Sequence, residues 1–284
     1  MLDFGGKQLD LDRPVVMGIL NVTPDSFSDG GDFVSSEVAV RRAREMVAEG
    51  AAIVDVGGES TRPGAGEVSV DEELERVLPV VEALAGALSV PISVDTTKPE
   101  VMREAVAAGA DMINDVLALQ VPGALETAAA LNVPVCLMHM QGTPRTMQRA
   151  PAYRNVVEDV RAFLSARIER CLEAGMDRER LIVDPGFGFG KNMTHNATLL
   201  RNLQRFGDLG CPILIGMSRK SFIGNVLDLP VTERLHGSVA AAVLGAWNGA
   251  RIVRVHDVAP TVQALKVTDF VARTHENNPG EGNG

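Results

Sequence analysis

Eight short and almost entirely apolar segments recur along the chain, each followed by a loop rich in Gly, Pro or Asp and then by a stretch with helical spacing. Strands without polar alternation are typical of a parallel sheet that helices cover on both faces. We therefore expect strands at residues 15–22, 53–57, 91–95, 112–116, 134–139, 181–185, 212–217 and 252–256. The helices are expected at residues 37–49, 71–88, 99–108, 123–132, 155–174, 197–206, 233–248 and 260–274.

Eight such units in about 250 residues predict a (β/α)8 TIM barrel, an α/β fold whose active sites lie at the C-terminal ends of the strands. A doubly wound open sheet is the alternative, but residues 21–25, after the first strand, lack the glycines of a dinucleotide fingerprint. No low-complexity linker divides the chain, so we expect a single domain over residues 1–275. Residues 2–11 predict a short β-hairpin that plugs the barrel bottom, and residues 276–284 a disordered tail.

Composition restricts the partners of the chain. It carries 27 Lys and Arg against 37 Asp and Glu, a net charge of −10, which argues against nucleic acid or an anionic membrane surface. No apolar run approaches the about 18 residues of a membrane span. The cysteines, Cys136, Cys171 and Cys211, are scattered and lack metal-ligand spacing, so we expect neither disulfides nor a zinc site. A cytoplasmic protein is the expectation.

If the barrel forms, the polar residues at the strand ends meet at one mouth, and they fall into two groups. The first six strands end in acidic, amide or imidazole side chains, namely Asn21, Asp55, Asp95, Asn114, His139 and Asp184. After the last two strands come mainly cations, in the set Ser218, Arg219, Lys220, Ser221, Arg254 and His256. In so acidic a chain this second group favours a phosphate or diphosphate site. The alternative is that these cations pair with carboxylates at the rim.

The acidic group is open to two functional interpretations. Converging carboxylates either hold a divalent metal or accept hydrogen bonds from an amino-substituted heterocycle. Asp55 fits a structural role equally well, because it can bond the backbone of the loop that follows it. His139, His195 and Cys136 are interpreted as core residues rather than ligands.

Residues 184–191, with the sequence DPGFGFGK, look like a nucleotide loop but match neither GxGxxG nor GxxxxGK[ST]. Their glycines permit positive φ and close backbone approach, which leaves Phe187 or Phe189 to cover a planar ligand. Residues 23–36 and 58–70 form connections longer than a barrel needs, and we expect them to act as lids at the mouth.

Five motifs, in this order, resemble the bacterial dihydropteroate synthase family: MGILNVTPDSFSDGG at 17–31, GESTRPG at 58–64, DPGFGFGK at 184–191, SRKS at 218–221 and RVHD at 254–257. The resemblance implies condensation of 6-hydroxymethyl-7,8-dihydropterin diphosphate with 4-aminobenzoate, which gives 7,8-dihydropteroate and diphosphate in folate biosynthesis. It also implies a Mg²⁺ cofactor, a homodimer and sensitivity to sulfonamides that mimic aminobenzoate.

The resemblance further implies roles for the matching positions. Three acceptors would hold the amino-pyrimidine edge and ring nitrogens of the pterin: Asp95, Asn114 and Asp184. Lys220 would contact the ring carbonyl and N5, which makes Asp95, Asp184 and Lys220 the expected catalytic residues. The diphosphate oxygens would be contacted by Thr61, Arg62, Arg254 and His256. Asn21 would bind the associated Mg²⁺, and whether Asp25, Asp29 or Asp32 also reaches the metal is left open. The aminobenzoate pocket would be shaped by Phe27, Pro63, Phe189 and Ser221.

These roles predict a dissociative, SN1-like substitution. Cleavage of the carbon–oxygen bond leaves positive charge on the pterin, near Asp95 and Asp184, and negative charge on the diphosphate, near Mg²⁺ and the basic residues. An aromatic amine is a weak nucleophile, so we expect the cation to form before the amine attacks. The alternatives are a pterin-binding methyltransferase domain, which has no diphosphate to bind, and a catalytically silent homologue, which would lack some of these ligands.

Overall fold

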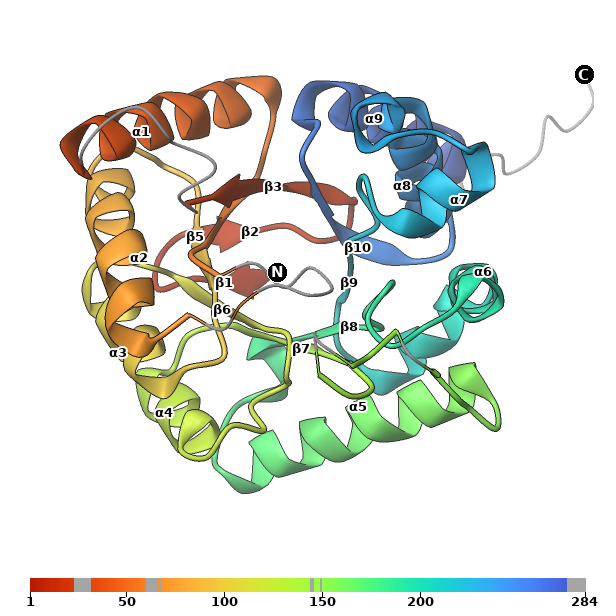
Figure 1. Cartoon of the computed structure of the whole chain (residues 1–284), viewed down its shortest axis with the longest axis horizontal. Coiled ribbons are helices and arrows are strands. Elements are labelled where there is room, and N and C mark those ends of the chain that lie inside the picture. The colour runs from red at the N-terminus through yellow and green to blue at the C-terminus, as the bar shows by residue number, and fades with distance from the viewer. Residues whose placement is uncertain (23–31, 60–65, 67, 144–145, 149, 275–284) are drawn as a thin grey trace, which may run out of the picture.

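Eight parallel strands form a closed barrel inside a ring of helices (Figure 1). The structure is a computed structural model that describes residues 1–22, 32–59, 66, 68–143, 146–148 and 150–274, without the side chains of residues 32–35. The barrel strands are β3 (Val15–Asn21), β4 (Ile53–Gly57), β5 (Ile92–Asp95), β6 (Met112–Asp115), β7 (Val135–Met138), β8 (Leu181–Asp184), β9 (Ile213–Ile215) and β10 (Ala250–Val255). They neighbour one another in chain order, and β10 closes the barrel on β3. The predicted TIM barrel is confirmed.

Helices connect the strands and cover the outside of the barrel. They are α1 (Asp32–Glu49), α2 (Val70–Ala85), α3 (Pro99–Ala107), α4 (Ala124–Leu131), α5 (Val156–Glu173), α6 (Met193–Arg201), α8 (Leu235–Trp247) and α9 (Val258–Thr274). The sequence analysis missed α7 (Ser221–Leu227), because a seven-residue helix with a central glycine leaves little periodic signal. Short 3₁₀ turns complete the connections: η2 (Arg178–Arg180), η3 (Leu203–Leu209) and η4 (Val231–Glu233).

The helix expected at 197–206 lies elsewhere. The structure has α6 followed by η3, and the expected range straddles the junction between them. A capping box starts α6 early: the Asn192 side chain accepts from the His195 N–H at 2.8 Å, and His195 Nδ1 accepts from the Asn192 N–H. His195 is therefore a half-buried capping residue and not the core residue that we expected.

An antiparallel hairpin of β1 (Leu2–Asp3) and β2 (Gln8–Leu9) closes the barrel bottom. Leu2, Phe4 and Leu11 form one buried apolar cluster with inward-facing barrel residues, including Met17, Ile53, Met112, Cys136, Ile182, Leu214 and Ile252. The predicted plug is confirmed, as is the core position of Cys136. Because this end of the barrel interior is filled with apolar side chains, the buried polar groups gather at the opposite end.

Parallel register places several strand ends at one level. Asn21 pairs with Gly57, Gly57 with Asp95, and Asp95 with Asn114 across three consecutive strand pairs. Further round the barrel, Met138 on β7 pairs with Asp184 on β8. The strand pairing itself therefore sets Asn21, Asp95 and Asn114 at one level of the mouth, with Gly57 between Asn21 and Asp95, independently of the loops.

Within the described residues, every helix is too short or too polar to cross a membrane. The predicted tail, residues 276–284, lies outside them.

Candidate active site

Arg254 links the acidic residues of the mouth. Its Nε donates to Asp55 Oδ2 at 2.5 Å and its Nη2 to Asp95 Oδ2 at 2.8 Å, so one side chain from β10 pairs with carboxylates on β4 and β5. Asn114 Nδ2 also donates to Asp55 Oδ2, at 3.3 Å. Asp55 is fully buried. The structure therefore assigns Asp55, whose role the sequence left open, to holding Arg254 and Asn114 in place.

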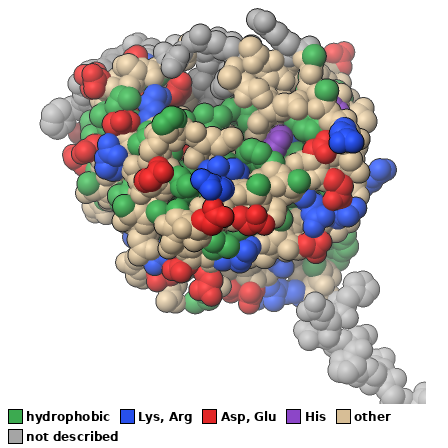
Figure 2. Space-filling view, turned by 90° about the horizontal axis from the view of Figure 1, so that it is seen from below, with side chains coloured by type: hydrophobic (Ala, Val, Ile, Leu, Met, Phe, Trp, Pro, Cys, Tyr) green, Lys and Arg blue, Asp and Glu red, His purple; other side chains and the backbone are tan. Residues whose placement is uncertain are grey.

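This arrangement differs from the separation of charges that the sequence suggested. Arg254 was grouped with the cations of an anion site, but it pairs with Asp55 and Asp95 on the acidic side. The physical reason is desolvation, since a buried guanidinium or carboxylate without a partner is costly. Positive and negative groups thus interleave at the mouth. On the outer side of the molecule shown in Figure 2, which is a different face from the mouth, basic and acidic side chains are also intermixed.

Burial governs the titration of the acidic residues. It raises the pKa of Asp95 to about 7, and the adjacent Arg254 guanidinium opposes this rise. Burial also raises the pKa of Asp184, against the opposing effect of Lys220 first and of further cations. A ligand that donates hydrogen bonds to both carboxylates would stabilise their ionised forms.

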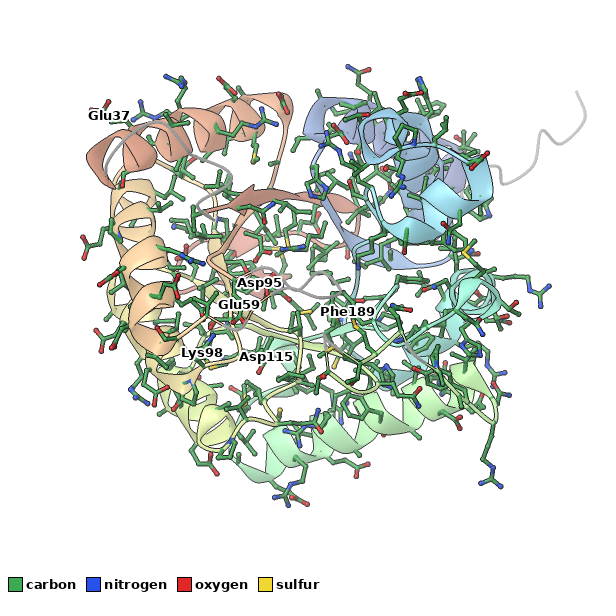
Figure 3. The ribbon with its side chains drawn as sticks, in the orientation of Figure 1. Glu37, Glu59, Asp95, Lys98, Asp115 and Phe189 are labelled. Atoms are coloured by element: carbon green, nitrogen blue, oxygen red, sulfur yellow. The ribbon has the colours of Figure 1, made fainter. Side chains whose placement is uncertain are left out.

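Asp184 and Lys220 approach each other through the loop after β8. Asp184 Oδ1 accepts from the Gly186 N–H at 2.7 Å, and Lys220 Nζ donates to the Phe187 carbonyl at 2.6 Å. The same ammonium lies 4.4 Å from the centroid of the Phe189 ring, a cation–π distance. Burial lowers the pKa of Lys220 to about 8, with Asp184 opposing the change. Asp95 and Phe189 both lie toward the middle of the ring of helices (Figure 3).

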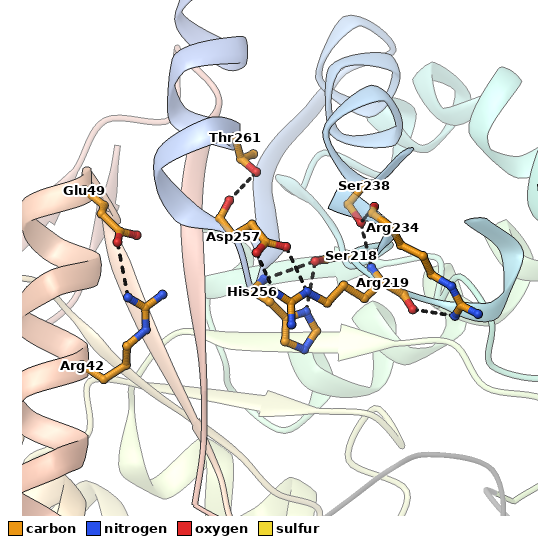
Figure 4. Close-up of polar contacts among 9 residues, drawn as sticks. All are labelled: Arg42, Glu49, Ser218, Arg219, Arg234, Ser238, His256, Asp257 and Thr261. Atoms are coloured by element: carbon orange, nitrogen blue, oxygen red, sulfur yellow. Dashed lines mark hydrogen bonds and ion pairs between the residues drawn. The ribbon is translucent and has the colours of Figure 1, made fainter. Parts of the chain in front are cut away.

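The remaining strand-end residues divide between the mouth and its rim (Figure 4). Ser218 Oγ lies 3.0 Å from His256 Nδ1 and accepts from the His256 backbone N–H at 3.2 Å, which fixes the imidazole. Arg219 donates twice to Asp257, from Nε to Oδ2 at 3.0 Å and from Nη2 to Oδ1 at 2.5 Å. For Arg219, the structure therefore has the rim pairing that we considered as the alternative to an anion site. Ser221 is exposed at the start of α7.

Four predicted site residues lie outside the described residues: Phe27, Thr61, Arg62 and Pro63.

An ion-pair cluster of Glu59, Glu73 and Lys98 was not expected from the sequence. Lys98 Nζ lies 2.5 Å from both Glu59 Oε2 and Glu73 Oε2, and the Glu73 side chain is fully buried. Glu59 Oε1 accepts from the Val68 N–H at 3.4 Å. A charged residue on the apolar face of the amphipathic helix α2 was the available signal, since such a residue needs a buried partner.

A closed parallel barrel with buried carboxylates, an amide and cations at its C-terminal mouth has the architecture of a barrel enzyme whose active site lies at that mouth. The pterin binding enzyme family matches residues 17–256. The dihydropteroate synthase of Escherichia coli K12 is 57 % identical over 272 residues, which cover 96 % of each chain.

Two solved structures are also similar. Yersinia pestis dihydropteroate synthase, in complex with a sulfonamide drug, has a TM-score of 0.90 and 53 % identity and covers 94 % of this chain and 98 % of its own. Xanthomonas albilineans dihydropteroate synthase with 4-aminobenzoic acid has a TM-score of 0.89 and 53 % identity and covers 98 % of each chain. The chain belongs to the pterin binding enzyme family, among its dihydropteroate synthases.

The Arg254 pairing predicts how Asp95 titrates. In Arg254→Met the pKa of Asp95 should rise by about 1 to 3 units above its wild-type value, because the opposite charge is lost from hydrogen-bond distance. Carboxyl ¹³C NMR of the free protein measures this titration. The control is Arg219→Met, which removes a guanidinium from the rim and should leave Asp95 unchanged. Equal Asp95 titrations in the wild type and Arg254→Met would contradict the pairing.

Proposed function

We propose that the chain makes 7,8-dihydropteroate by binding the pterin of its diphosphate substrate at Asp95, Asn114 and Asp184. The observation that carries this proposal is the convergence of the three acceptors: register sets Asp95 beside Asn114, and Asp184 ends a strand of the same mouth. The amino-pyrimidine edge of a pterin presents N–H donors, and carboxylate and amide oxygens are the acceptors that such an edge requires.

Lys220 completes the pterin site with a hydrogen-bond donor. Its ammonium is oriented by the Phe187 carbonyl and lies over the Phe189 ring, near the charge of Asp184. A donor in this position suits the ring carbonyl and N5 of the pterin, which are acceptors. Donors and acceptors of the heterocycle thus meet groups of the opposite kind.

The acidic residues also suit the reaction. As the carbon–oxygen bond at the pterin methylene breaks, positive charge spreads into the ring, and preorganised carboxylates stabilise it without reorganisation. Arg254 and His256, together with Thr61 and Arg62, bind the departing diphosphate. Arg254 can serve both groups, because it pairs with Asp95 and carries further N–H donors for the diphosphate. The aniline nitrogen of 4-aminobenzoate then attacks the methylene carbon, and the new C–N bond is completed as that nitrogen loses one proton to water or to the diphosphate.

Mg²⁺ fits this mouth as a partner of the diphosphate. Asn21 ends β3, and a Cβ placed on Gly57 would lie 4.0 Å from Asn21 Oδ1 and 3.6 Å from Asp95 Cβ, so the two side chains flank the same glycine. No cluster of three His, Cys, Asp or Glu side chains that could hold a metal occurs within the described part of the chain. An oxygen ligand from the protein with phosphate oxygens and water is a typical Mg²⁺ environment. Asn21 would hold the ion, which when bound neutralises charge on the leaving group.

The aminobenzoate pocket is assigned to Phe27, Pro63, Phe189 and Ser221. Phe189 is buried in a cluster with Val116, Met138, Met140 and Met147, which holds its ring beside Lys220. The Xanthomonas relative with 4-aminobenzoic acid and the Yersinia relative with a sulfonamide support a pocket of this chemistry here, and with it sensitivity to sulfonamides.

The cysteines favour a cytoplasmic location. Cys136, Cys171 and Cys211 are buried and form no disulfide, as is usual in a reducing cytoplasm, and cell fractionation tests this location.

Two substitutions test the pterin site. Asp184→Asn and Lys220→Ala should each lower kcat/KM about a hundredfold, or about 3 kcal/mol, because each removes one charge that stabilises the transition state. The assay follows diphosphate release on mixing both substrates with Mg²⁺. Asp208→Asn, an exposed change on η3, is the control and should retain full activity. Near-full turnover in both site variants would refute the assigned roles.

Isotope exchange tests the order of bond breaking. If the cation forms first, an ¹⁸O label in the ester oxygen between the pterin methylene and the α-phosphorus should scramble into the non-bridging positions of that phosphorus when 4-aminobenzoate is absent. Phosphorus NMR of recovered substrate measures the exchange.

The role of Asn21 is tested in the same assay. Asn21→Ala should slow the exchange at limiting Mg²⁺, and the exchange rate should recover when Mg²⁺ is in excess. Complete absence of scrambling in the wild type favours direct displacement, and an unchanged Mg²⁺ requirement in Asn21→Ala removes Asn21 from the metal site.

We also propose a homodimer formed through α8 and α9. These adjacent helices expose large apolar side chains, namely Leu244, Trp247, Val267, Phe270 and Val271, of which Phe270 is 73 % exposed. A second copy of the chain is the expected partner, because exposed apolar patches of this kind mark interfaces.

The dimer is tested by sedimentation at micromolar concentration. Phe270→Glu should convert it to monomers, because a charge would be buried in the interface. Ala107→Glu places the same charge on exposed α3 and serves as the control. A wild-type monomer, or a dimer that survives Phe270→Glu, would contradict the proposed interface.

A further inference from the structure

Lys191 is a buried cation that no step of the reaction above uses. Its side chain is almost completely inaccessible, with 2 % of the residue exposed. The Nζ atom donates to three acceptors: His139 Nδ1 at 2.9 Å, the Phe189 carbonyl at 2.9 Å and the His139 carbonyl at 3.3 Å. Among the described residues it forms no ion pair with a carboxylate within 4.0 Å. Such a burial calls for a function, because an isolated buried ammonium is costly.

The donors and acceptors around Nζ match in number. An ammonium carries three N–H groups, and three acceptors surround it. His139 must then be neutral and accept at Nδ1, which agrees with a pKa lowered to about 3 by burial and by the nearby Lys191 charge. Burial lowers the pKa of Lys191 to about 7, and Asp184 opposes this change. A neutral amine would leave one of the three acceptors without a donor.

The three acceptors belong to two segments that touch through their backbones. A Cβ on Gly186 would lie 1.9 Å from the His139 carbonyl oxygen, and one on Gly190 would lie 2.5 Å from that of Gln141. Both glycines have positive φ, +71° and +65°. The loop after β8 therefore lies directly on residues 139–141, so closely that no side chain fits between the two backbones at Gly186 or Gly190. Lys191 links this loop to His139 by its hydrogen bonds.

The same loop carries residues of the proposed pterin and aminobenzoate sites. Asp184 accepts from Gly186, the Phe187 carbonyl orients Lys220, and Phe189 lies against the Lys220 ammonium. The His139 N–H also donates to the Asp184 carbonyl, at 2.9 Å. Lys191 thus binds a loop whose position decides where three site residues lie.

We propose that Lys191 is a positioning residue of the reaction: its buried ammonium fastens the loop after β8 to the end of β7, fixes Asp184 and Phe189, and keeps Asp184 ionised from behind. The inference rests on the proposed roles of Asp184 and Phe189. Lys191 makes no hydrogen bond to Asp184 among the described contacts and acts on it through charge, so that it leaves the carboxylate oxygens to the Gly186 N–H and to the pterin.

Several titratable groups face this arrangement from the elements packed around it. They are His139 after β7, Asp184 at the end of β8, Lys220 before α7, His195 on α6 and Tyr153 before α5, with Arg254 acting on Asp184 from β10. Tyr153 also holds the loop, since its hydroxyl donates to the Gly190 carbonyl at 2.7 Å. It does so without a charge, which makes it the matched comparison for Lys191.

The test is the pH profile of kcat/KM for the pterin diphosphate in Lys191→Met, Tyr153→Phe and the wild type. Loss of the Lys191 charge raises the pKa of Asp184, so the acid limb in Lys191→Met should shift upward by about 0.5 to 1 pH unit. The KM of both substrates should rise about tenfold, because the loop loses three hydrogen bonds. Tyr153→Phe should raise KM less and leave the acid limb in place. An acid limb and KM values equal to those of the wild type in Lys191→Met would overturn the inference.

A second variant answers the question if Lys191→Met does not fold. His139→Phe keeps the Lys191 charge, removes one of its acceptors and suits the rings of Phe163 and Tyr153 that face His139. It should raise the KM of both substrates about threefold with an unchanged acid limb, and unchanged KM values would count against the inference. The wild type and Asp184→Asn are measured in parallel. The proposed function fails if the wild type is inactive or if Asp184→Asn keeps wild-type activity. If the wild type is active, Asp184→Asn loses activity as expected and Lys191→Met has wild-type KM values and acid limb, only the role of Lys191 fails.

Discussion

The mouth of this barrel depends on the pairing of one buried arginine with two carboxylates. Arg254 reaches from β10 to Asp55 on β4 and to Asp95 on β5, and Asn114 on β6 joins the same Asp55 oxygen. One guanidinium serves two carboxyl groups in a region of low dielectric, and burial still raises the pKa of Asp95 to about 7. In the proposed function, the pterin brings N–H donors and becomes cationic as its leaving group departs, and it would so supply the further stabilisation that these carboxyl groups need. The ion pair between Arg254 and the two carboxyl groups would thus also prepare the mouth for the transition state of the proposed reaction.

One end of the barrel interior is apolar and the other is polar, because apolar residues lie at the beginnings of the strands and polar residues at their ends. The apolar inward residues at their beginnings pack with Leu2, Phe4 and Leu11 of the hairpin. At their ends, parallel register sets Asn21, Asp95 and Asn114 in a row. The hairpin fills the barrel interior and makes it rigid. Asn21, Asp95 and Asn114 benefit from this rigidity, since side chains on paired strands keep their spacing better than side chains on loops.

The sequence predicted the barrel and the list of strand-end residues, because apolar runs and barrel geometry require no knowledge of contacts. It did not predict which of those residues pair. Arg219 and Arg254 looked alike as cations after the last two strands. The backbone of Arg219, however, has φ of +59°, and its partly exposed side chain pairs with Asp257 at the rim. Arg254 lies on a strand and enters the interior. Pairing of Arg254 with Asp55 joins positions 199 residues apart, which no local pattern reveals.

Asp184 shows how a site can supply charge without using up its acceptors. A buried carboxylate that must stay ionised needs cations nearby, but a cation bound directly to both oxygens would compete with the substrate. In the proposed pterin site, Lys220 faces the ligand, and its ammonium donates to the Phe187 carbonyl. Lys191 lies behind the loop, bound to His139 and to Phe189. Because we propose that Lys191 acts on Asp184 through its charge rather than through a hydrogen bond, this charge would act on Asp184 both before and after the pterin binds.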